Sequence, residues 1–222
     1  MIAAATAEAM ATVVATVVAN MTAAVKAAVK AANAAAKTGS LWLVPLLLTA
    51  APARSAEQRY VLDPAHSWVH FEVLHFGTST VRGRFGPVGG EVLLDPASGR
   101  AEVSLRIPTA SVDTGIGVFN ARLKEDDLLA TTAWPEAFFV ATRGRFEGTR
   151  LVELRGEFTF RGVSQPLSLR ALRYTCLSDA EGEVCGGDFE ATLNRSEFGA
   201  TFGLPFIADR VRLQLQVEGR RR

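Results

Sequence analysis

The sequence contains few of the side chains from which metal sites and covalent catalysts are built. Among its 222 residues there are only two cysteines and three histidines. Cys176 and Cys185 lie in one Gly- and Asp-bearing connection with no histidine cluster nearby, so they cannot complete a four-ligand zinc site. In an oxidising compartment the two thiols would pair. We therefore expect no metal and a local disulfide, with two free thiols as the alternative.

The chain also lacks an excess of charge of one sign. It has 24 basic and 23 acidic residues, a formal net charge of +1. A nucleic-acid-binding protein needs a clustered positive face, and the one basic run, Arg220–Arg222, is typical of a solvated tail. We expect no nucleic-acid partner.

No apolar run is long enough to cross a bilayer, which takes about 20 residues. The only candidate is the short run Leu41–Leu48, which follows the lysines of an Ala-rich segment and precedes the small residues of Ala51–Ala56. This order is typical of a secretory signal. We expect residues 1–56 to be an N-terminal extension plus signal peptide, cleaved between Ala53 and Ala56, and the mature protein to be periplasmic or secreted. An uncleaved membrane anchor and a misassigned upstream start codon are the alternatives.

From Tyr60 onward, apolar residues alternate with polar ones. Val69, Phe71 and Val73, for example, alternate with His70 and Glu72, a period typical of a strand with one apolar face. About eight such segments follow one another between Gly- and Pro-containing turns, which predicts an antiparallel meander. Such a sheet either closes on itself or packs against a second sheet. One helical stretch is expected, from Val118 to Leu129.

Three short motifs occur in order along this part of the chain. Tyr60–Ser67 reads YVLDPAHS, Ser111–Gly115 reads SVDTG, and Asn194–Gly199 reads NRSEFG. Together they resemble the YceI-like family, secreted lipocalin-like barrels that bind polyisoprenoid lipids. The resemblance spans about Tyr60 to Glu218. It implies an all-β fold, an antiparallel lipocalin-like β-barrel of about eight strands with one short helix. That domain would occupy residues 57–222, after a helical or disordered extension at 1–56.

The resemblance further implies a binding protein without a cofactor, not an enzyme. Its ligand would be a long-chain isoprenoid lipid, a polyisoprenoid or an isoprenoid quinone, held in the barrel for carriage, storage or protection. The inward positions mix large residues with small ones such as Gly83 and Ala137, which could leave either a filled core or a tunnel. The family favours the tunnel. Its expected apolar wall, with His75 at the mouth facing a polar head, comprises Val69, Phe71, Val73, His75, Phe85, Leu105, Phe139, Phe158, Phe160, Leu213 and Leu215.

Two polar motifs have simpler interpretations than catalysis. Asp63, His66 and Ser67 supply an acid, an imidazole and a hydroxyl, but His66 and Ser67 are neighbours and would point to opposite faces of a strand, which does not suit a catalytic triad. The pair Asp63-Pro64 is typical of a turn, and we expect it to open the first strand. Arg195 is expected to be structural, binding carbonyls or pairing with Asp209 to direct the loop that follows. A contact with a lipid head group is the alternative role for Arg195.

Other functional sites and functions are compatible with the sequence. His66, His70 and Glu72 share a parity, so a shared metal is conceivable, although satisfied or solvent-facing histidines are expected. An enzyme acting on a hydrophobic substrate would place His66, His75 or Asp63 at the mouth. A solid-cored module that binds another protein in an envelope stress response is the third hypothesis. We also expect the protein to contact a membrane during lipid exchange. A homodimer through an exposed edge or the mouth of the barrel is a further expected assembly.

Overall fold

The computed structural model describes residues 57–222. The extension, the signal peptide and the cleavage site expected within residues 1–56 lie outside the described residues. Within residues 57–222, none of the helices has the length and apolar character that crossing a membrane requires.

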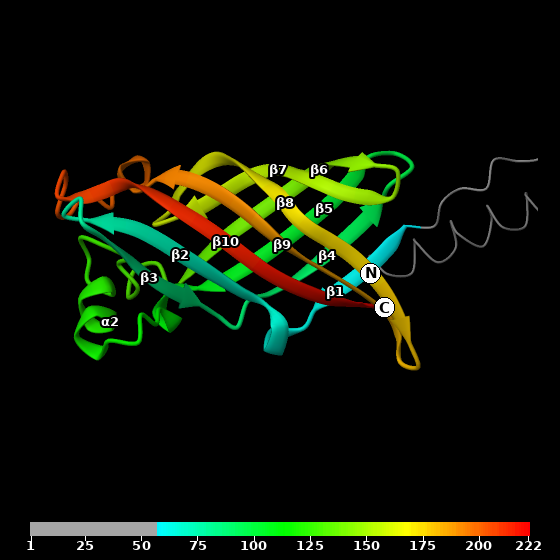
Figure 1. Ribbon diagram of the computed structural model, residues 1–222, viewed down its shortest axis with the longest axis horizontal. Helices are drawn as coiled ribbons and strands as arrows, with labels where there is room; N and C mark the ends of the chain where they lie inside the picture. The colour runs from blue at the N-terminus through cyan, green and yellow to red at the C-terminus, as the bar shows by residue number, and fades with distance from the viewer. Residues whose placement is uncertain (1–56) are drawn as a thin grey trace, which may run out of the picture. The chain divides into compact units, whose positions relative to one another are not determined.

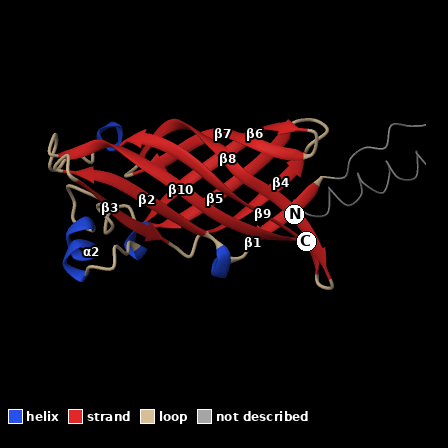
Figure 2. Ribbon diagram, viewed as in Figure 1, coloured by secondary structure: helices blue, strands red, loops and turns tan. Residues whose placement is uncertain are grey.

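The described chain is almost entirely antiparallel β-sheet, with short helices in the connections (Figures 1 and 2). The strands are β1 (Gln58–Leu62), β2 (Trp68–His75), β3 (Ser79–Phe85), β4 (Gly89–Asp95), β5 (Arg100–Pro108), β6 (Glu136–Glu147), β7 (Arg150–Phe160), β8 (Val163–Asp179), β9 (Gly182–Asn194) and β10 (Ile207–Arg221). The helices are the 3-10 turns η1 (Pro64–His66), η2 (Thr109–Ser111) and η3 (Arg195–Phe198) and the α-helix α2 (Gly117–Leu123).

The sheet closes into a barrel because β1 pairs with β4 on one side and with the end of β10 on the other. Strands β1 and β4 to β10 follow one another around a ring, and β1 closes it by pairing with the end of β10, where Leu62 faces Gly219. The earlier part of β10 pairs with β2 instead, from Ile207 opposite His75 to Gln216 opposite Trp68. Strands β1 and β2 are therefore two halves of one wall. The predicted antiparallel barrel is confirmed.

The turn predicted at Asp63-Pro64 is the helix η1, which separates those two halves. The Asp63 carboxylate caps it by accepting a hydrogen bond from the Ala65 amide at 2.9 Å. The turn thus lies between β1 and β2 instead of opening the first strand as predicted, because the five-residue strand β1 precedes it. Ser67, which is fully buried, then bonds the Glu218 backbone through its hydroxyl and anchors the break to β10.

At the end of the barrel opposite to β1, the wall is incomplete on one side. Strand β3 pairs with β2, but on its other side the only ladder contact among the described residues is the bridge between Arg84 and Asp113. The connection from β5 to β6 carries α2 and lies at this end (Figure 1, left). The helix predicted from Val118 to Leu129 is wrong in its extent, since α2 ends at Leu123 and turns follow. The carboxylates of Asp126 and Asp127 would oppose the dipole at the end of a longer helix.

The β8–β9 hairpin extends beyond the barrel and carries the disulfide. Cys176 and Cys185 face each other across the two strands, with their Cα atoms 4.0 Å apart and their sulfurs bonded. The disulfide predicted from the sequence is confirmed. It ties together two neighbouring strands and does not connect distant parts of the fold.

Candidate functional site

The barrel contains an apolar cavity of about 330 Å³ in the half that holds α2. Of the wall residues predicted from the sequence, the structure places against this cavity Val69, Phe71, Val73, His75, Phe85, Phe139, Phe158, Phe160, Leu213 and Leu215. The inward face of the strands thus comes directly from the alternation in the sequence.

Leu105 is the exception and does not line this cavity. Its side chain is buried, 3% exposed, and faces a second, smaller cavity of about 50 Å³ further along the barrel. The alternation placed Leu105 on the correct face of β5. It could not indicate the height of the residue along the barrel axis, which depends on the tilt and stagger of the strands.

Aromatic rings shape the large cavity, and small residues leave room for them. Phe71 reaches across its β3 neighbour Gly83, where a Cβ atom would lie 2.5 Å from the ring, and its centroid is 5.3 Å from that of Phe85. On β7, the rings of Phe158 and Phe160 both line the cavity, with their centroids 6.2 Å apart. The space remains because Ala137 and Ala200 also line the cavity without filling it.

Part of the wall comes from connections between strands and was not predicted from the sequence. The connection around α2 contributes Phe119, Arg122, Leu123, Leu128 and Leu129, and the loop before β10, together with the first residue of that strand, contributes Ala200, Phe202 and Ile207. Phe119 and Leu123 are four residues apart on the expected helix, a spacing that marks one helical face and could have identified them. Phe202 lies in a loop without periodicity, and no pattern in the sequence indicates that it belongs to the site.

Four polar side chains line the cavity, and three of them, Thr109, Arg122 and Arg195, bond within the protein, while the His75 ring packs against Phe76 with centroids 4.5 Å apart. Thr109 donates its hydroxyl proton to the Trp134 carbonyl at 2.7 Å. Arg122 forms two hydrogen bonds with the Asp127 carboxylate, at 2.6 and 2.7 Å, and its guanidinium lies 4.0 Å from the centre of the Phe202 ring. These contacts leave the wall chemically suited to an apolar guest.

Arg195 holds the loop that precedes β10. The residue is 7% exposed, and its guanidinium donates to three carbonyls, those of Ala208 at 3.0 Å, Ala200 at 2.6 Å and Ile207 at 2.8 Å. Asp209 binds Ser196 instead, accepting from its amide at 2.8 Å and its hydroxyl at 2.7 Å. Of the two partners expected for Arg195, the structure therefore shows the carbonyls. Burial lowers the pKa of the Arg195 guanidinium.

The histidines are not arranged as a metal site on one strand face. His66 lies in η1, away from His70 and Glu72, and its Nδ1 atom is 2.7 Å from Oδ2 of Asp63. The hydrogen bond to Asp63 raises the pKa of His66, and the same bond lowers the pKa of Asp63. With Glu218, this pair is the one group in residues 57–222 whose atoms lie close enough to hold a metal ion. Neither Asp63 nor His66 lines the cavity.

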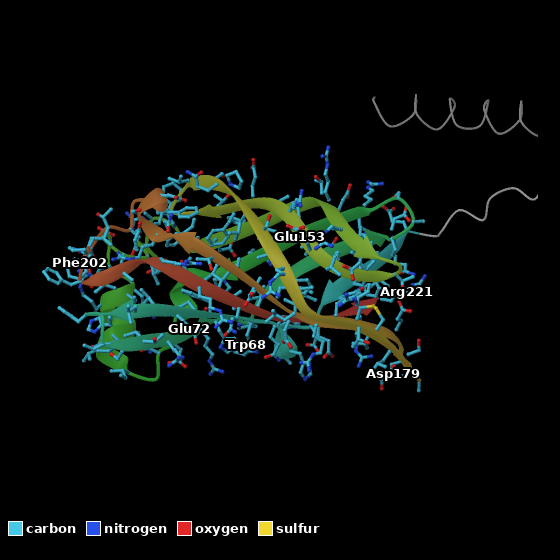
Figure 3. All side chains as sticks on the ribbon, turned by 45° about the horizontal axis from the view of Figure 1, so that its top comes forward. Trp68, Glu72, Glu153, Asp179, Phe202 and Arg221 are labelled. Atoms are coloured by element: carbon cyan, nitrogen blue, oxygen red, sulfur yellow. A yellow bond between two sulfur atoms is a disulfide. The ribbon has the colours of Figure 1, made fainter. Side chains whose placement is uncertain are left out.

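The cavity reaches the surface beside α2. Phe119 and Phe202 line it and are nevertheless 42% and 43% exposed, and Figure 3 shows Phe202 at the tip of the barrel. Further exposed apolar side chains lie on these two segments, the start of α2 and the loop before β10, and on the β2–β3 turn. This group, here called the mouth rim, comprises Phe76, Ile116, Val118, Phe119, Phe202 and Phe206.

The fold matches several solved structures. BcnA of Burkholderia cenocepacia superimposes with a TM-score of 0.59 at 21% identity, covering 71% of this chain and 98% of that one. A polyisoprenoid binding domain from Saccharophagus degradans superimposes with a TM-score of 0.56, also at 21% identity, covering 73% of this chain and 98% of the other. At this level of identity the likeness concerns the fold alone.

Sequence comparison identifies the family. Protein YceI of Salmonella arizonae is 30% identical over 179 residues, which cover 80% of this chain and 93% of the relative. Protein YceI of Shigella flexneri is 29% identical over 181 residues, covering 81% of this chain and 94% of the relative. The family model for the YceI-like domain matches residues 60–219, nearly the whole barrel. The chain belongs to the YceI-like family.

Proposed function

We propose that this protein binds a long apolar lipid, a polyisoprenoid or an isoprenoid quinone, in the barrel cavity for carriage, storage or protection. The observation that carries the proposal is the cavity of about 330 Å³, whose wall is mainly aromatic and aliphatic. Three of its four polar side chains, Thr109, Arg122 and Arg195, form hydrogen bonds within the protein. Burying each CH₂ of such a ligand contributes about 0.8 kcal/mol before the costs of association. Tight binding therefore needs no catalytic group.

Two further observations support the proposal. The solved relative from Saccharophagus degradans is described as a polyisoprenoid binding domain. The disulfide between Cys176 and Cys185 suits an oxidising compartment, as expected of a periplasmic or secreted protein. The cavity itself counts against a solid-cored interaction module, and the position of Asp63 and His66 outside it counts against their action on a bound hydrophobic substrate.

The test is to purify the mature protein after expression of the full chain, extract it with organic solvent and analyse the extract by mass spectrometry. We expect a co-purifying isoprenoid, and uptake of added prenol or quinone by protein that has been stripped of lipid. Protein that is lipid-free on isolation and binds neither compound in calorimetry would refute the proposal.

We also propose that the mouth rim contacts a membrane during lipid exchange. Phe76 and Phe206 are 59% and 64% exposed, their rings stack with centroids 5.9 Å apart, and they stand on two of the segments that surround the opening. Exposed apolar patches of this kind mark interaction sites, and aromatic side chains suit the interface between lipid and water. A lipid that passes from a bilayer into the cavity would then avoid crossing water.

A matched pair of variants tests this contact. Burying a Phe side chain contributes about 1.5–3 kcal/mol, so F206S should lower co-sedimentation with phosphatidylethanolamine–phosphatidylglycerol vesicles at least tenfold. Leu177 is 71% exposed on the β8–β9 hairpin and is not part of the mouth rim, so L177S serves as the control. Equal loss in the two variants, or no loss in either, would exclude a specific role of the rim.

A further inference from the structure

The barrel interior is divided into two compartments along its length. The large cavity, of about 330 Å³, opens beside α2, and the small cavity, of about 50 Å³, lies beyond it. Among the described residues, Leu169 of β8 and Leu215 of β10 belong to the walls of both cavities, and no other residue does. Both side chains are buried, at 2% and 4% exposed, so they form the shared boundary.

We propose that Leu169 and Leu215 form a partition that sets the length of chain the barrel accommodates. This inference rests on the proposed lipid-binding function and adds a determinant of specificity to it. A prenyl chain that enters at the mouth would advance through the large cavity until its end meets these two leucines. Isoprene units beyond that length would remain outside the barrel and would add no affinity.

The chemistry of the small cavity suits the end of an apolar chain. Its wall is largely aliphatic and includes Leu94, Leu105 and Leu154, all of them buried. Two tyrosines also line it, and of these Tyr60 is 2% exposed and donates its hydroxyl proton to Glu183, with Gln58 Oε1 3.1 Å away. The second tyrosine of the wall, Tyr174, is partly buried, with its hydroxyl 3.3 Å from the Cys176 sulfur. Because the rest of the wall is mostly carbon, removing the partition would make the small cavity an apolar extension of the large one.

The sheet register explains why shortening these leucines would join the cavities. Leu215 lies between Val69 on β2, which lines the large cavity, and Phe189 on β9, which lines the small one. Leu169 lies beside Leu154 on β7, another residue of the small cavity. Each leucine therefore stands at the level where the wall changes from one cavity to the other. Removing a side chain at this level leaves a void contiguous with both.

The test compares the affinities of linear prenols with three, four, six and eight isoprene units, measured by displacement of a fluorescent apolar probe. For the wild type, affinity should rise with length and then level off. In L215A and in L169A the plateau should move to a longer prenol, and that prenol should bind at least tenfold more tightly than it binds the wild type. This expectation is conservative, since each buried CH₂ contributes about fourfold.

The matched control is L105A, because Leu105 is buried and lines the small cavity alone. It enlarges the small cavity without opening the partition, so its length profile should match that of the wild type. L215V preserves the fold if L215A does not, and it should shift the plateau in the same direction by less. The partition would be overturned if folded L215A and L169A had unchanged length profiles, or if L105A showed an equal shift. In either case, prenol binding by the wild type would still support the proposed function. Wild-type protein that binds no prenol of any length would overturn both.

Discussion

Filling the cavity from its wall should remove ligand affinity without harming the fold. Ala137 of β6 is 3% exposed, lines the large cavity and pairs across the sheet with Ile107, which lines it too. Replacing Ala137 by Leu adds three carbons at a point where the structure has space. Extra carbons in a filled core typically cost 1–3 kcal/mol. For A137L we expect the free energy of unfolding to stay within about 1 kcal/mol of the wild type, or to rise.

The loss of affinity follows from the ligand carbons that the new side chain displaces. If three carbons are excluded at about 0.8 kcal/mol each, binding weakens by about 2.4 kcal/mol, a factor of about 60 in Kd. Calorimetric titration with a prenol or a quinone measures this change, and urea unfolding measures the stability of the same sample.

Ala141 supplies the contrast on the same strand and the same face. It is 2% exposed but lines neither cavity, and a Cβ at its neighbour Gly156 would lie 2.9 Å from the Ala141 side chain. A141L should therefore lose about 1–3 kcal/mol of stability through overpacking. If A137L is destabilised as much as A141L, or if it binds the lipid as tightly as the wild type, the cavity is not the binding site.

Three further predictions concern the supports of the site. R195M leaves three carbonyls of the loop without their buried donor, so urea unfolding should show a loss of about 3–5 kcal/mol, and a loss under 1 kcal/mol would contradict the role assigned to Arg195. Reducing the disulfide between Cys176 and Cys185, nine residues apart, should lower the free energy of unfolding by about 2.6 kcal/mol according to the chain-entropy relation. Unfolding with and without dithiothreitol measures this loss, and equal stability in the two conditions would refute a stabilising role. Because Asp63 raises the pKa of His66, D63N should lower that pKa in an NMR titration, and an unchanged value would exclude the pairing. The His66 contribution to stability is full below the ordinary histidine pKa and is lost as the pH rises through the raised value.

The depressed pKa of Asp63 has the opposite consequence at acid pH. Its contribution to stability is full above the ordinary aspartate pKa and disappears as the pH falls through the lowered value. The pair therefore contributes most between the two pKa values, where Asp63 is ionised and His66 is protonated. The His66 side chain is 58% exposed and that of Asp63 27%, so solvent screens the pair and the effect on global stability should be small.

The amino-acid sequence by itself determined which residues face the barrel interior. In a strand, successive side chains alternate between the two faces, so the sequence alone predicts that Val69, Phe71 and Val73 share the apolar, inward face of their strand. The turn at Asp63 and the disulfide could also be predicted from the sequence, because both depend on residues close together in the chain. Both inferences rest on short-range geometry.

Only the tertiary structure decided where along the barrel each inward residue lies. Leu105 and Phe139 are neighbours across β5 and β6 and face the same interior, yet they line different cavities. Strand tilt and stagger fix that height, and both follow from closure of the whole sheet. The same holds for Phe202, which a loop without periodicity brings to the mouth, and for Leu169 and Leu215, whose shared boundary exists only because distant strands meet around one interior.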